Sequence, residues 1–253
     1  MTIARKFFAV LVALLIATSP AAQSAPHELP VSIVLVHGVL IDGSSWRGVY
    51  DVLTRRGFRV SVVQQPLTGF NDDVAATKRV IDQQDGPVVL VGHSYGGAII
   101  TVAGTDPKVK ALVYVAGLQP DVGETAGEVA PPKPPADKHL VPSKDGFVFV
   151  DPAHFAQDVA ADLPKARTDF MAHAQMPVAA SAFAVKMPAA AWHDKPSYAV
   201  IATQDHALDI ERAKWMAHRA GSKVTFVNAS HAVLVSQPRA VAKVIETAAL
   251  SVP

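Results

Sequence analysis

The chain has 253 residues, half of them hydrophobic, and its 23 basic and 22 acidic side chains give a formal net charge of +1. This near balance excludes the strongly basic surface that is typical of proteins that bind nucleic acids or anionic membranes. The absence of cysteine excludes disulfides, thiol nucleophiles and thiolate metal sites. The length suits one large α/β domain with an inserted segment.

The first 25 residues have the pattern of an export signal. Arg5 and Lys6 precede an apolar run at 7–17, and small residues follow as far as Ala25. The apolar run of about 11 residues is too short to span a bilayer, which needs roughly 20. We predict a cleavable signal peptide at 1–25 and a periplasmic or secreted mature protein without stable membrane insertion. An uncleaved membrane anchor is the alternative.

Short apolar runs alternate with amphipathic stretches from residue 31 onward. The runs lie at 31–36, 58–63, 87–91, 111–115, 198–202 and 223–227. Most are continuously apolar, which is typical of parallel strands covered by helices on both faces. The helical spacing i, i+3, i+4, i+7 occurs twice, in Trp46, Val49, Tyr50 and Leu53, and in Val241, Val244, Ile245 and Ala248. Pro238 suits the first turn of this last helix. The pattern predicts an α/β fold with a mostly parallel, open, twisted sheet of about six strands flanked by helices.

The segment 119–196 interrupts this alternation. Between residues 118 and 196 the chain has 11 of its 19 prolines, and PPKPP at 131–135 excludes helix interior and central strand. No strand pair is predicted here, whereas 154–159 and 166–174 have the character of short helices. We expect a mainly helical lid at 119–196, inserted into a core formed by 26–118 and 197–253. The alternative is a disordered linker, although large side chains make the segment too apolar for a solvated one, among them Phe147, Phe149, Phe155, Phe170, Met171 and Phe183.

The sequence GHSYGG at 92–97 follows the apolar run 87–91 directly. A G-x-S-x-G pentapeptide between a buried strand and a helix is typical of a nucleophile elbow. Its serine has a strained backbone, so the neighbouring residues must lack side chains that would collide. This pattern predicts Ser94 as a nucleophile at the carboxyl edge of the sheet. An ordinary glycine-rich turn is the alternative.

A serine nucleophile needs a base and a group that orients the base. His231 follows the sixth run and precedes the last helix, while Asp205 follows the fifth run, so both should reach the edge that holds Ser94. Asp121, after the fourth run, is the rival for the orienting acid. Asp205 could instead cap a helix, a role that Asp209 could also fill.

Two backbone N–H groups are candidates for an oxyanion hole. Tyr95 follows the serine at a helix start, and Val39 lies in the loop after the first run, with Leu40 as the second choice in that loop. His37 is interpreted as a residue that structures the same loop. His93 is interpreted as a packing residue that points away from the cleft, because side chains alternate along a strand.

These motifs resemble those of the α/β-hydrolase superfamily. The segments VLVHGVLIDGSSW at 34–46, GHSYGG at 92–97 and SHAV at 230–233 are similar to the small esterase and methylesterase branch, which also includes hydroxynitrile lyases. The resemblance covers essentially the whole mature chain, and the lid only by its position. It implies Ser94 as nucleophile, His231 as base, Asp205 as acid, and Val39 and Tyr95 as oxyanion donors.

The expected activity is hydrolysis of small to medium, moderately apolar carboxylic esters through an acyl-enzyme. The resemblance implies no cofactor, and the sequence has no metal-binding motif such as H-E-x-x-H. The expected partner is a small-molecule ester and not a nucleic acid, and the oligomeric state stays undetermined. The alternatives are a cofactor-free perhydrolase or haloperoxidase-like enzyme, and a ligand-binding protein that has lost turnover.

Overall fold

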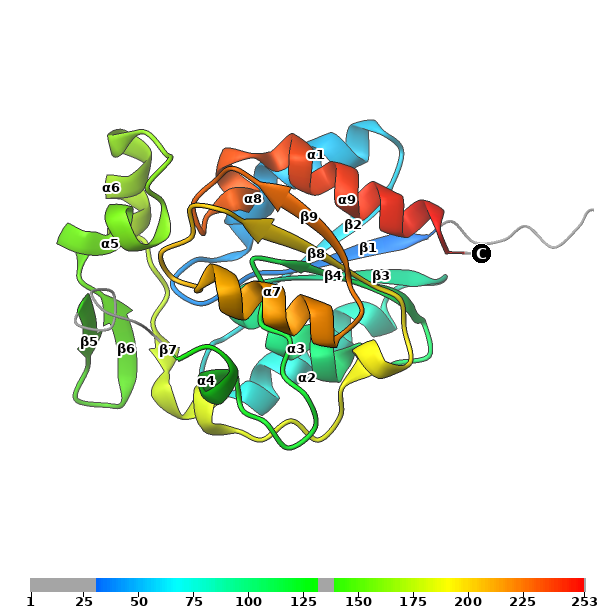
Figure 1. The fold of residues 1–253 in the computed structure, drawn as a ribbon, viewed down its shortest axis with the longest axis horizontal. Helices are drawn as coiled ribbons and strands as arrows, with labels where there is room; N and C mark the ends of the chain where they lie inside the picture. Colours follow the sequence, from blue (N-terminus) through cyan, green and yellow to red (C-terminus); the bar gives the residue numbers. More distant parts are fainter. Residues whose placement is uncertain (1–30, 132–138, 253) are drawn as a thin grey trace, which may run out of the picture.

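The computed structural model describes residues 31–131 and 139–252. Its centre is a six-stranded parallel sheet with the strand order β2-β1-β3-β4-β8-β9 (Figure 1). The strands are β1 (Ser32–Val36), β2 (Arg59–Val63), β3 (Val88–His93), β4 (Val109–Val115), β8 (Ser197–Ala202) and β9 (Lys223–Val227). All six coincide with the predicted runs to within a few residues. The predicted parallel sheet is therefore confirmed.

Helices cover both faces of this sheet (Figure 1). On one face pack α2 (Phe70–Asp82), α3 (Tyr95–Ala103) and α7 (Ile210–Arg219). On the other face pack α1 (Arg47–Arg55), α8 (Val233–Ser236) and α9 (Pro238–Leu250). Because both faces are covered, β1, β3 and β8 are buried along their whole lengths, which explains their continuously apolar sequences.

The two helices with the clearest apolar spacing form where they are predicted. In α1 the buried residues are Val49, Val52 and Leu53, whereas Tyr50 is 37% exposed, so it does not belong to the core face. In α9 Pro238 occupies the first turn, where its missing N–H removes no intrahelical hydrogen bond.

Part of the chain between β4 and β8 forms a group of short elements beside the edge at which the strands end, and its last part, with the 3-10 helix Ala191–His193, packs against α3 (Figure 1). Helices α5 (Pro152–Val159) and α6 (Lys165–His173) match the two predicted helices. The other elements are α4 (Ala126–Val129), the 3-10 helices Ala180–Ala184 and Ala191–His193, and the strands β5 (Leu140–Pro142), β6 (Phe147–Val150) and β7 (Val178–Ala179).

The three short strands β5, β6 and β7 pair in antiparallel fashion, so the expectation of no strand pair in this segment is wrong. Strands of two to four residues are too short to show a period of two in sequence. Pro142 fits because β5 is an edge strand, where a proline breaks no ladder. The predicted signal peptide lies outside the described residues, and so do positions 132–135 of the proline-rich stretch.

Within 31–131 and 139–252, no helix is both long enough and apolar enough to cross a membrane.

Candidate active site

Ser94 lies in a sharp turn between β3 and α3. Its φ of 52° and ψ of −125° place it outside the regions that residues other than glycine normally adopt. Two glycines make the turn possible. A Cβ at position 92 would lie 2.4 Å from the Gly96 carbonyl oxygen, and one at 96 would lie 2.5 Å from that of His37. The steric requirement inferred from the G-x-S-x-G pattern is therefore met by backbone packing on both sides of Ser94.

A chain of hydrogen bonds joins Ser94 to two residues that follow later strands. Ser94 Oγ lies 2.8 Å from His231 Nε2, and His231 Nδ1 lies 2.7 Å from Asp205 Oδ2. A carboxylate can only accept, so a neutral His231 carries its proton on Nδ1 and presents the Nε2 lone pair to the serine hydroxyl. The structure thus brings together the three residues that the sequence analysis selected.

The carboxylate of Asp205 is held by its own loop. Oδ1 accepts hydrogen bonds from the backbone N–H groups of Ala207 at 2.9 Å and Leu208 at 2.8 Å, which leaves Oδ2 for His231. The side chain is only 3% exposed. Asp209 caps α7 by accepting from the Arg212 N–H, so Asp205 is not needed for that role.

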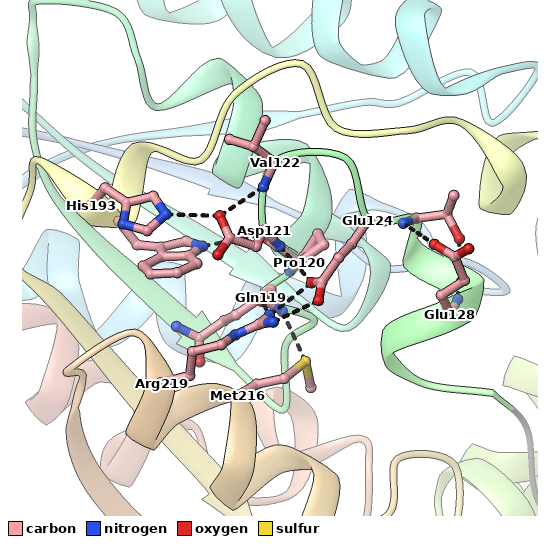
Figure 2. Close-up of polar contacts among 11 residues, drawn as sticks. Gln119, Pro120, Asp121, Val122, Glu124, Glu128, His193, Met216 and Arg219 are labelled. Carbon is pink, nitrogen blue, oxygen red and sulfur yellow. Dashed lines mark hydrogen bonds and ion pairs between the residues drawn. The ribbon is translucent and has the colours of Figure 1, made fainter.

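Asp121, the rival acid, belongs to a different network (Figure 2). Its Oδ1 contacts His193 Nε2 at 2.7 Å and accepts from the Val122 N–H. Figure 2 also shows Arg219 from α7 donating to both carboxylate oxygens of Glu124, in the loop that leads into the insertion. Asp121 therefore takes part in fastening this loop and does not contact His231.

The geometry separates the two loop candidates for an oxyanion donor. The Leu40 N–H donates to the Met176 carbonyl oxygen at 3.2 Å, so it is already engaged. The N–H groups of Val39 and Tyr95 make no hydrogen bond to any residue that the structure describes, and both residues line the cavity beside Ser94. The Tyr95 N–H also lies at the start of α3, where the helix dipole favours negative charge.

His37 structures the loop after β1. Its Nε2 accepts from the Gln65 N–H at 3.0 Å, so Nδ1 carries the proton and donates to the Gly38 carbonyl oxygen at 2.7 Å. Burial lowers its pKa. The side chain is thus a neutral bridge between the first loop and the segment after β2, which agrees with its interpretation as a structuring residue.

The interpretation of His93 requires a correction. The residue is buried, as a packing residue should be, but it lines the cavity, and its Nε2 lies 3.0 Å from the carbonyl oxygen of His231. The alternation of side chains along β3 places His93 on the face of Val89 and Val91, where it packs against Trp46, and from this face its ring also reaches the ring of His231. His206, adjacent to Asp205, points instead to the Gln157 carbonyl oxygen in α5.

A cavity of about 320 Å³ lies beside Ser94 and His231. Its walls combine the first loop, the elbow and the insertion, and apart from Ser94, Tyr95 and the two histidines they consist of apolar residues and glycine. The insertion and the loop that leads into it contribute Leu118, Val159, Val178 and Phe183 to this lining. No acidic side chain and no lysine or arginine lines the cavity, so the described lining offers no salt-bridge partner to a charged ligand.

Asp73 is a residue near the site that the sequence analysis missed. Its buried carboxylate accepts from the Tyr95 hydroxyl at 2.9 Å and from the Leu67 N–H at 2.8 Å. Burial raises the pKa of Asp73 to about 6, and burial together with this carboxylate also raises that of Tyr95. A signal was present in the sequence, because Asp73 lies three residues after Phe70, on the apolar face of α2.

In residues 31–131 and 139–252, no group of three or more His, Asp or Glu side chains is arranged to hold a metal ion.

A parallel sheet with a strained serine between strand and helix, followed by an acid and a histidine after later strands, defines the class of α/β-hydrolase proteins. The chain belongs to the alpha/beta hydrolase family, whose family model matches residues 33–244.

Two curated relatives match part of the chain. It is 29% identical over 114 residues to the carbendazim hydrolyzing esterase of Nocardioides sp. (strain SG-4G), covering 40% of this chain and 47% of that protein. It is 31% identical over 117 residues to the pyrethroid hydrolase of Sphingobium wenxiniae, covering 38% of this chain and 41% of that protein. The chain spans less than half the length of these two relatives.

A solved structure extends the similarity over the whole fold. The crystal structure of a pyrethroid hydrolase from Sphingobium faniae JZ-2 covers 87% of this chain and 98% of its own, with a TM-score of 0.74 and 22% identity. At this identity the comparison shows a shared fold.

Proposed function

We propose that this protein is a serine esterase that hydrolyses uncharged, moderately apolar carboxylic esters of small to medium size. The observation that carries the proposal is the hydrogen-bonded chain from Ser94 through His231 to Asp205 at the wall of an apolar cavity. Both curated relatives carry names that describe hydrolysis, which supports the same reaction class.

The reaction begins when Ser94 Oγ attacks the ester carbonyl carbon and its proton passes to His231 Nε2. Asp205 stabilises the imidazolium that forms. The carbonyl oxygen becomes an oxyanion, which accepts hydrogen bonds from the Val39 and Tyr95 N–H groups, each worth roughly 2.7–4 kcal/mol in comparable sites. His231 then protonates the leaving alcohol, and an acyl-enzyme on Ser94 remains.

Water then hydrolyses the acyl-enzyme and releases the carboxylic acid, with His231 again acting first as base and then as acid. His231 removes a proton from water, the hydroxide attacks the acyl carbon, and Ser94 Oγ leaves with the proton returned by His231. The described cavity lining contributes no charged partner for either half of the ester, so an acidic or cationic substrate would lose its hydration without compensation. This is why the proposal specifies uncharged substrates.

The protein is tested with a panel of p-nitrophenyl esters and with a fluorophosphonate that labels activated serines. Ser94→Ala should lower turnover by roughly 10⁴-fold or more and abolish labelling. The control is Ser197→Ala, because Ser197 is a buried serine at the start of β8, at the opposite end of the sheet, bonded to Ser222. Turnover near that of the wild type in Ser94→Ala, or loss of labelling in the control alone, would contradict the proposal.

We further propose export of the protein by the signal at 1–25. Fractionation of expressing cells, with mass determination of the mature N-terminus, tests it; uncleaved protein retained in cells would overturn it.

A further inference from the structure

We propose that His93 is a positioning residue that holds the catalytic base, His231, and sets its distance from the first loop. The inference rests on the proposed function, because it assigns the base role to His231. It concerns a buried histidine that takes no proton in the reaction.

The loop that carries His231 is fastened at three consecutive residues. Ser230 Oγ donates to the carboxylate of Asp162, and the Ala232 N–H donates to the Val159 carbonyl oxygen at 2.9 Å, so the insertion holds both neighbours of the base. The carbonyl oxygen of His231 itself accepts a hydrogen bond from His93 Nε2, at the end of β3, at 3.0 Å. Asp205 holds the ring of His231, whereas His93 holds its backbone from the end of β3.

The tether fixes the proton arrangement on His93. A carbonyl oxygen only accepts, so Nε2 must carry the proton, and Nδ1 is left as a buried atom without a hydrogen-bond partner in the described structure. Burial, followed by the nearby charge of His231, lowers the pKa of His93 well below its ordinary value. A neutral ring suits this place, because a second cation would oppose the imidazolium that forms on His231.

The ring of His93 also acts as a spacer. Its centroid lies 4.9 Å from that of His231, and Trp46 packs edge-on against it at 6.4 Å. On the first loop, a Cβ at Gly38 would lie 2.8 Å from His93 Nδ1, so this loop approaches the ring as closely as its backbone allows. His93 is thus in contact both with the loop that presents the Val39 N–H and with the loop that presents the base.

Three substitutions separate these roles. His93→Leu keeps a buried side chain of similar bulk but removes the donor, whereas His93→Gln keeps an N–H donor on a flexible side chain. Tyr198→Phe is the control, because it removes a hydrogen bond from a buried side chain, to Ser251, in the first half of β8 and remote from the site. Thermal melting identifies the stability loss that each variant suffers.

The measurements are kcat, KM and the rate of fluorophosphonate labelling for one p-nitrophenyl ester. We expect His93→Leu to lower kcat and the labelling rate by about 10- to 100-fold, with KM within about threefold, since a misplaced base impairs proton transfer and not binding. His93→Gln should recover a large part of this loss. The downfield proton resonance of the His231–Asp205 hydrogen bond should broaden or shift in His93→Leu and return in His93→Gln.

If His93 has only a structural role, His93→Leu should lose stability, as Tyr198→Phe does, but keep the kcat and the proton resonance of the wild type. This result would overturn the inference. The activity of Ser94→Ala separates a failure of this inference from a failure of the proposed function. If Ser94→Ala abolishes turnover while His93→Leu leaves kcat unchanged, only the role of His93 is wrong; if Ser94→Ala is active, the esterase mechanism itself is wrong.

Discussion

At the scale of single residues, Asp73 shows how a buried carboxylate influences both the site and the stability of the fold. It bonds to the hydroxyl of Tyr95, whose backbone N–H is a proposed oxyanion donor, and to the Leu67 N–H. Its pKa of about 6 exceeds the ordinary value of roughly 3.9 because burial disfavours the charged form. The carboxyl thus binds its proton more tightly in the folded chain than in the unfolded one.

This difference predicts a pH dependence of stability. Between pH 4 and 6 the folded state holds more protons than the unfolded state at this position, so the free energy of unfolding falls as the pH rises through that range. Asp73→Asn removes the ionisation. Its free energy of unfolding relative to the wild type should therefore increase by up to about 3 kcal/mol between pH 4 and pH 7, as measured by urea denaturation.

Asp72→Asn serves as the comparison for this experiment, because Asp72 is the exposed neighbour on the same helix and bonds to Thr68. It should change the pH profile much less than Asp73→Asn does, because the charge of Asp72 is the smallest of the causes that shift the pKa of Asp73. A profile for Asp73→Asn that runs parallel to that of the wild type would show that Asp73 does not titrate as described.

At the scale of elements, the elbow depends on the close approach of α3 to the end of β1. A Cβ at Gly96 would lie 2.5 Å from the His37 carbonyl oxygen and 2.8 Å from that of Val36, and both atoms belong to the backbone. The backbone cannot yield there without moving the loop that presents Val39. Tight packing between two elements therefore supports the geometry of the proposed oxyanion hole.

Gly96→Ala should consequently affect both folding and catalysis. We expect a loss of about 2–3 kcal/mol in the free energy of unfolding, as is usual for overpacking, and a fall in kcat of at least about tenfold. Gly69→Ala is the matched control, since its Cβ would meet only Asp72 Oδ2 at 3.4 Å. Equal stability and activity of the two variants, in denaturation and ester assays, would contradict this account.

At the scale of the whole molecule, the insertion and the core share a hydrophobic cluster. Phe155 and Met171 from α5 and α6 pack with Ile41 from the first loop and Ala232 next to the proposed base. The hydrogen bonds from Ser230 to Asp162 and from Ala232 to Val159 join the same two parts. We therefore expect the insertion to unfold together with the sheet and not as an independent lid.

Phe155→Ala tests this coupling. Phe155 is fully buried, so its truncation should lower the free energy of unfolding by about 3–5 kcal/mol. If the insertion and the sheet unfold together, tryptophan fluorescence and the hydrogen exchange of α5 should report the same, destabilised transition. Trp46 and Trp215 belong to the core, and Trp192, near the end of the insertion, lies outside α5 and α6 and packs into the cluster that covers the sheet. Phe170→Ala, at a side chain that is 66% exposed, should change stability by less than about 0.5 kcal/mol. Separate transitions for α5 and for the tryptophans would show independent unfolding.

Much of the fold and of the site was predictable, because the signals involved are local. The continuous apolar runs identified β1, β3 and β8, and the glycines around Ser94 identified the elbow, since their steric role depends on immediate neighbours. The positions of Asp205 and His231 after strands placed them at one edge, because the carboxyl ends of parallel strands meet there. The catalytic roles of these residues stay predictions until the variants are measured.

The remaining features depend on contacts between segments far apart in the chain. The pairing of β5 with β6, the choice between Asp205 and Asp121, and the bond from His93 to His231 have no local signature. The sequence by itself determined a parallel α/β sheet and a strained serine, because hydrophobic periodicity and backbone sterics act over a few residues. Only the tertiary structure decided which acid contacts His231 and which side chain bonds to its carbonyl oxygen, because hydrogen bonds form between whichever groups the folded chain brings within about 3 Å.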